Sequence, residues 1–77
     1  MFFIYGDVRL EYQEGKGYRH PREGTWVEDH RQCLRGWIED DPQRRRQWAA
    51  LMLRLDDFWP RVEKNRLEVG EEVVFED

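Results

Sequence analysis

The residues best suited to chemistry are His30 and Cys33, which lie three positions apart. On a helix this spacing puts an imidazole and a thiol on one face, as two metal ligands or a nucleophile and its base require. Zinc needs four ligands, however, and the other histidine, His20, falls in a separate segment. A cysteine nucleophile also needs an orienting group and an oxyanion hole, for which the sequence has no motif. We therefore expect no catalytic residue, no metal and no cofactor.

Neighbouring carboxylates at residues 39–41 and 56–57 are the second candidate for chemistry. Catalytic carboxyl groups need an apolar environment that raises the pKa of one of them. Because 39% of the chain is charged and no acid sits in an obviously apolar pocket, we expect these acids to be solvated.

Three adjacent arginines, Arg44, Arg45 and Arg46, form the third feature. They fall in the first turns of a predicted helix, whose free N–H groups already create a positive potential. Such a cluster suits a carboxylate patch on a partner protein, or a phosphate. The alternative is local pairing with Asp40 and Asp41.

The same helix carries an apolar patch, Ala49, Ala50 and Leu53, opposite its predicted core face. Two alanines allow close approach of a partner, although the sheet or the C-terminal tail could also cover the patch. Asp57, in the last predicted turn, opposes the helix dipole and can pair along the helix. Together these features predict a partner-binding surface made of Arg44, Arg45, Arg46, Ala50, Leu53 and Asp57.

These residues are positioned by a long helix predicted over residues 42–59. Asp41 can cap its start, Pro42 suits the first helical position, and Pro60 predicts an end or a kink after residue 59. Apolar residues recur on one face at helical spacing: Trp48, Leu51, Met52, Leu55, Phe58 and Trp59.

A second, shorter helix is predicted from Thr25 to Ile38, with Thr25 and Glu28 as a capping box. Gly36 weakens it by about 1 kcal/mol relative to alanine. The short link to Pro42 predicts that the two helices are antiparallel or steeply crossed.

The N-terminal region predicts antiparallel strands. Residues 2–5 and 8–12 form either a hairpin around residues 6–7 or one long strand with a glycine bulge, and both registers fit. Residues 18–20 can return beside residues 8–12. After the long helix, residues 61–64 could add a helical turn, and residues 66–75 predict a strand or a short hairpin that joins the sheet.

The predicted fold class is therefore α+β: a small antiparallel sheet, built from an N-terminal hairpin and a C-terminal strand, packed against two helices. At 77 residues this is one domain, residues 1–77. Its aromatic residues can fill a small core, and a second subunit could complete it. The single cysteine and the absence of a long apolar run predict a cytoplasmic protein without a membrane span.

The net charge of −4 is unevenly distributed, with +2 in residues 42–59 and −3 in each of residues 28–41 and 60–77. A general nucleic-acid binder needs a broad basic face, so nucleic acid is not the expected partner. The leading hypothesis is a non-enzymatic interaction protein, such as an inhibitor, an immunity or phage protein or an adaptor, that binds another protein, for example an enzyme or a toxin, or a second copy of itself. The alternatives are a nucleic-acid-related protein, either a DNA mimic or a phosphate-contacting antitoxin, and a small metal-binding or enzyme subunit.

Overall fold

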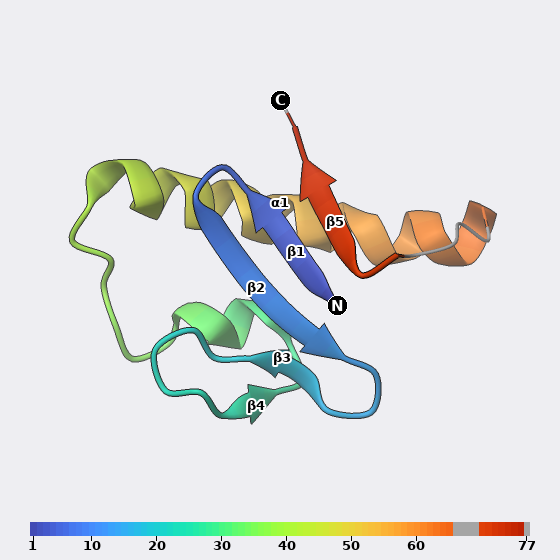
Figure 1. Ribbon diagram of the computed structural model, residues 1–77, viewed down its shortest axis with the longest axis horizontal. Coiled ribbons are helices and arrows are strands. Elements are labelled where there is room, and N and C mark those ends of the chain that lie inside the picture. Colours follow the sequence, from blue (N-terminus) through green and yellow to red (C-terminus); the bar gives the residue numbers. More distant parts are fainter. Residues whose placement is uncertain (66–69, 77) are drawn as a thin grey trace.

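The computed structural model describes residues 1–65 and 70–76. One long helix crosses one face of a five-stranded sheet, and a short 3-10 helix fills the corner beside it (Figure 1). The elements in chain order are β1 (Phe2–Tyr5), β2 (Val8–Gln13), β3 (Gly17–Arg19), β4 (Trp26–Val27), the 3-10 helix η1 (His30–Leu34), α1 (Pro42–Asn65) and β5 (Glu72–Phe75). Within the described part of the chain, no helix has both the length and the apolar character of a membrane span.

The strands are arranged in the order β4-β3-β2-β1-β5. Tyr5 pairs with Val8, so residues 6–7 form a two-residue hairpin turn, and the long-strand alternative is wrong. Gly6 has a φ of 57°, a conformation that glycine adopts without strain. Strand β3 returns antiparallel to β2, as expected, with Tyr12 opposite Tyr18.

The sheet is mixed, whereas the sequence predicted an antiparallel one. Strand β5 runs parallel to β1, with Phe2 opposite Glu72 and Tyr5 opposite Phe75. The reason is the length of α1: its 24 residues span about 36 Å and carry the chain back to the end of the sheet where β1 begins (Figure 1). Residues 66–69 of the predicted C-terminal strand lie outside the described residues.

The expected second helix is absent from the described residues, and α1 is their one α-helix. Residues 26–27 pair with β3 instead, and the helical turn that follows is capped by Asp29 rather than by Thr25. The Asp29 side chain accepts from the N–H of Arg31, and the Gln32 side chain accepts from the N–H of Asp29. The turn then ends because Arg35 is extended and Gly36 has a φ of 88°.

Helix α1 begins where the sequence predicted but continues beyond residue 59. The Asp41 side chain accepts from the N–H of Gln43 at 2.9 Å, which confirms the cap. Pro60 lies inside the helix, so the predicted end at Trp59 is wrong, whereas the helical turn that residues 61–64 could add is confirmed. Proline removes only one hydrogen bond, and Trp59 is held on the sheet because its indole N–H donates to the Tyr18 hydroxyl at 2.6 Å.

The core lies between α1 and the face of the sheet that carries Phe3 and Leu10, both fully buried. The core is rich in aromatic rings, as predicted. The Phe3 ring meets the Phe58 ring edge-on at a centroid distance of 5.2 Å and stacks on the Phe75 ring at 6.1 Å. The predicted apolar face of α1 is confirmed, since its buried residues are Trp48, Leu51, Met52 and Leu55.

Candidate interaction surface

Cys33 is fully buried at the base of η1. Burial raises its pKa to about 12, and the nearby Asp29 carboxylate adds to this effect. Since the thiolate is the nucleophilic form, burial and the raised pKa both disfavour nucleophilic reactivity of Cys33 at neutral pH.

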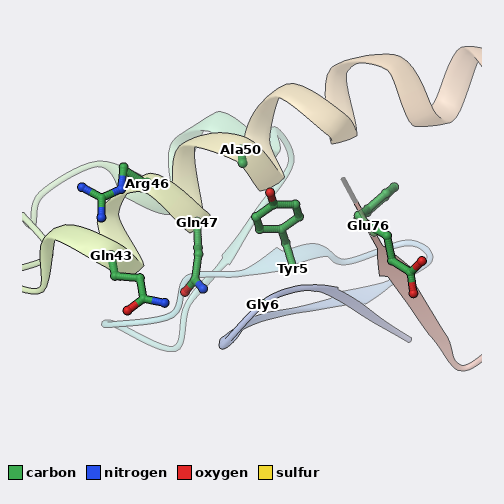
Figure 2. A pocket seen from close by; sticks show the side chains of 8 residues that line it. Tyr5, Gly6, Gln43, Arg46, Gln47, Ala50 and Glu76 are labelled. Atoms are coloured by element: carbon green, nitrogen blue, oxygen red, sulfur yellow. The ribbon is translucent and has the colours of Figure 1, made fainter.

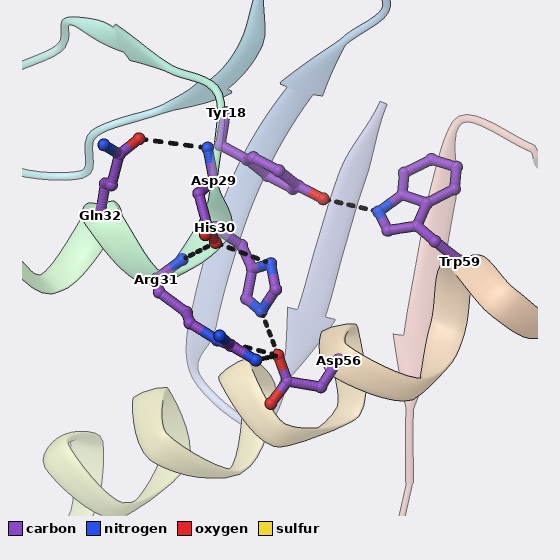
Figure 3. A network of polar contacts seen from close by, with 7 residues as sticks. All are labelled: Tyr18, Asp29, His30, Arg31, Gln32, Asp56 and Trp59. Atoms are coloured by element: carbon purple, nitrogen blue, oxygen red, sulfur yellow. Dashed lines mark hydrogen bonds and ion pairs between the residues drawn. The ribbon is translucent and has the colours of Figure 1, made fainter.

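His30 is instead part of a polar cross-link between η1 and α1 (Figure 3). Its Nε2 lies 2.7 Å from Oδ1 of Asp56, and its Nδ1 lies 3.5 Å from Oδ1 of Asp29. The guanidinium of Arg31 donates to the same Asp56 oxygen from Nη2 at 2.9 Å and from Nε at 3.2 Å. The hydrogen bond with His30, followed by that with Arg31, lowers the pKa of Asp56. This cluster holds two elements together and leaves His30 little accessible surface.

His20 is also structural, and only 3% of it is exposed. Its Nδ1 accepts from the backbone N–H groups of Arg22 and Glu23, so its Nε2 carries the proton and donates to the carbonyl of Arg35 at 2.8 Å. Among residues 1–65 and 70–76, no group of His, Cys, Asp or Glu side chains is placed to hold a metal ion.

The three arginines at the start of α1 point in different directions. Arg44 makes a long ion pair of 4.0 Å with Asp41, and Arg45 donates from Nε to the carbonyl of Glu39 at 3.0 Å. Arg46 is exposed and lines a hollow together with Tyr5 of β1 and Phe75 of β5. Successive helical residues are about 100° apart, and the three arginine side chains line three different hollows of the surface.

Four of the six predicted residues share one flank of α1, because Arg46, Ala50, Leu53 and Asp57 are spaced at i, i+4, i+7 and i+11. We call these four residues the α1 flank. Leu53 is 69% exposed, and Asp57 pairs with Arg61 at 2.9 Å. The predicted stripe therefore lies on the solvent-accessible side of α1.

A shallow hollow of about 630 Å³ joins the α1 flank to the end of the sheet (Figure 2). Tyr5 rises from β1 toward Ala50, while Arg46 lies at the far side of the hollow from Glu76. The residues that line it are Tyr5, Gly6, Gln43, Arg46, Gln47, Ala50, Phe75 and Glu76. The flank thus borders β5, an adjacency that the helical period alone could not reveal.

The sequence did not predict that one face of the sheet, the face opposite α1, is left uncovered. This face points toward the viewer in Figure 1. Side chains that alternate with the buried ones lie here, among them Phe2 and Ile4 of β1 and the 59%-exposed Val74 of β5. Charged residues surround them, since Arg9 covers the Phe2 ring at 3.9 Å and Arg19 lies 3.6 Å from Glu11. The signal that could have revealed this face is β1 itself, which is apolar at every position.

No protein-family model, curated protein or solved structure matches this chain.

Proposed function

We propose that this chain is a non-enzymatic protein–protein interaction module, of the inhibitor, immunity-protein or adaptor kind, that binds another protein through the α1 flank. The observation that carries the proposal is the exposure of Leu53, 69% of whose surface is accessible on a helix whose other large apolar side chains are buried or half-buried. The partner is a protein, such as an enzyme or a toxin, and self-association through the same flank is the alternative.

A single exposed leucine is common on protein surfaces, so its surroundings matter. Ala50, one helical turn before Leu53, also lines the hollow, where Tyr5 and Phe75 add apolar surface. Charges of both signs, Arg46 and Asp57, lie along the flank. An apolar centre with a charged rim is the usual anatomy of a protein interface, where the rim charges guide encounter and orientation.

The environment of Cys33 supports a role in the cytoplasm. A fully buried free thiol is compatible with a reducing compartment and needs no disulfide partner. We therefore include cytoplasmic location in the proposal.

The test is substitution at the centre of the flank. Leu53→Arg should leave thermal unfolding unchanged and abolish either self-association in sedimentation or retention of a specific partner from lysate of the source cell, measured by quantitative mass spectrometry. Ile38→Arg is the matched control, because Ile38 is 75% exposed but lies outside α1. If the Leu53→Arg protein is folded and retains every partner and oligomer that the wild type has, the proposal is wrong.

Charge reversal at Arg46 tests the role of the rim. Arg46→Glu should slow association and change its dependence on salt, with a smaller effect on dissociation. Surface plasmon resonance with the captured partner at several salt concentrations separates the two rates.

A further inference from the structure

We propose that the outer edge of β5 binds an extended, basic segment of a partner protein as a sixth strand of the sheet. The inference rests on the proposed function, because it names how the partner of this interaction module is recognised. It concerns a different surface from the α1 flank, so the two can be tested separately.

The edge is open because β5 is the last strand of the sheet and no described residue pairs with its outer side. The N–H of Phe2 donates to the carbonyl of Glu71 at 2.8 Å, so the backbone of Glu71 faces β1. Backbone groups of successive residues in a strand point to opposite edges. Val73 and Phe75 therefore also face β1, whereas Glu72 and Val74 direct their N–H and C=O groups outward. These groups are what an added strand would bind.

The side chains of an added strand would meet two different environments, one on each face of β5. Val73 and Phe75 lie on the covered side of the sheet, where they pack against the core. Glu72 and Val74 alternate with them and lie on the uncovered face. A strand at this edge would place every second side chain beside apolar groups and the others beside Glu72.

The negative charge of the glutamates in and beside β5 favours binding of a basic segment. Glu71 and Glu76 flank β5, and Glu72 lies within it. Glu72 has an ion pair with Arg9, but their N–O distance is 3.9 Å and both side chains are more than half exposed, so this pair is weak. Lysine or arginine beside Glu72 would gain a cross-strand ion pair, whereas an acidic residue would be repelled.

A second copy of the chain fits this edge poorly. If two β5 strands paired antiparallel about Val74, Glu72 of each copy would lie opposite Glu76 of the other. If they paired about the midpoint between Val73 and Val74, Glu71 would lie opposite Glu76 in the same way. Like charges directly opposite each other destabilise a strand pair. The acids therefore disfavour self-pairing and leave the edge available to a basic partner.

Proline, lysine and β-bulges, three other devices that protect sheet edges, are missing from β5. At the opposite edge of the sheet, β4 has only two residues and offers much less backbone. Of the two edges, β5 therefore offers more backbone for pairing with an added strand.

Val74→Pro tests the backbone contact directly. Proline removes the N–H of residue 74, which faces outward, and leaves the hydrogen bonds to β1 intact, as is tolerated on edge strands. The probe is a fluorescein-labelled peptide of three Lys-Val repeats, with a peptide of three Glu-Val repeats as the control. The Lys-Val peptide should bind the wild type measurably and the proline variant at least about tenfold more weakly. Val74→Thr, which keeps the N–H, should bind it like the wild type.

Hydrogen exchange separates strand pairing from simple charge attraction. In the free protein the N–H groups of Glu72 and Val74 should exchange rapidly and those of Val73 and Phe75 slowly, because only the latter face β1. Addition of the Lys-Val peptide should slow exchange at Glu72 and Val74. Binding without this protection, equal binding of the Glu-Val peptide, or full binding by Val74→Pro would overturn the proposal.

A second variant keeps the test decisive if the proline variant unfolds. Glu72→Lys should reverse the preference, so that the Glu-Val peptide binds more tightly than the Lys-Val peptide, and an unchanged preference would contradict the proposal. Failure of the peptide tests together with Leu53-dependent partner binding would reject only the β5 proposal. If the Lys-Val peptide binds as expected but Leu53→Arg does not weaken partner binding, only the α1-flank proposal is rejected.

Discussion

His30 Nε2 lies 2.7 Å from Oδ1 of Asp56, a contact between residues 26 positions apart that joins η1 to α1. Arg31 donates to the same oxygen, so one carboxylate receives two partners from a single turn of 3-10 helix. The segment from β4 to η1 is too short to pack by itself, and this contact connects it to the long helix.

Asp56→Asn should lower the melting temperature at pH 7 by a few degrees. The pKa of Asp56 is lowered in the folded protein, so its stabilising contribution is present above the ordinary carboxyl pKa of about 4 and is lost as the pH falls through the lowered folded value. The difference between variant and wild type should therefore shrink below about pH 4. Circular dichroism melts from pH 2 to pH 7 measure this.

The adjacent Asp57 provides the control for that experiment. Its ion pair with Arg61 is exposed on both sides, so Asp57→Asn should change the melting temperature little at any pH. Equal losses at the two positions would mean that the contact with His30 contributes nothing specific.

Leu55→Ala should lower the free energy of unfolding by about 2–5 kcal/mol, because Leu55 is 1% exposed and alanine would leave a cavity. Trp48→Ala, at 6% exposure, should be at least as damaging. A domain of this size has only about 3–5 kcal/mol of net stability, so either variant should be largely unfolded. Urea titration followed by tryptophan fluorescence (by circular dichroism for Trp48→Ala) gives the measurement.

Leu53→Ala makes the same chemical change on the same helix at a position that is 69% exposed. It should alter the free energy of unfolding by no more than about 0.5 kcal/mol. A mild, cooperative transition for Leu55→Ala, similar to that of Leu53→Ala, would show that α1 does not organise the core.

The protein should lose stability in alkali between about pH 9 and pH 12. Burial raises the pKa of Cys33 from 9.0 and that of Tyr18 from 10.0, each to about 12. The neutral forms are thus favoured by folding, and their contribution is complete below the unfolded pKa values and lost as the pH rises toward the folded ones. Cys33→Ala should reduce the slope of stability against pH in this range.

Thiol reactivity offers an independent check on Cys33. At pH 8 the folded protein should react with Ellman's reagent far more slowly than the protein in urea, because the thiol is fully buried and protonated. Equal rates in the two conditions would contradict the burial of Cys33.

Duplex DNA should bind weakly at physiological salt and with a shallow salt dependence. The arginines at residues 44–46 point in different directions and two of them have acceptors close by, so few phosphates can be neutralised together. A slope of log K against log salt steeper than about −5, equivalent to six phosphates, would favour a nucleic-acid function over protein binding. Fluorescence anisotropy over a salt series provides the slope.

Local sequence determined the start and the buried face of α1. Asp41 and Pro42 act within one turn, and the apolar period from Trp48 to Leu55 needs only the geometry of a helix. The hairpin turn at residues 6–7 is local in the same sense, although the sequence did not choose between it and a bulge. The exposure of Leu53 also follows from the helical period.

Contacts between distant residues decided the features that the sequence did not predict correctly. Residues 26–27 form a strand that pairs with β3 instead of the first turn of the predicted second helix. The hydrogen bond from Trp59 to Tyr18 helps hold α1 on the sheet where the helix continues past Pro60. The parallel direction of β5 depends on where α1 returns the chain. Because of that direction, Phe75 and Glu76 line the same hollow as Ala50. No local sequence pattern predicts this, because register and strand order are set by which faces can be buried together.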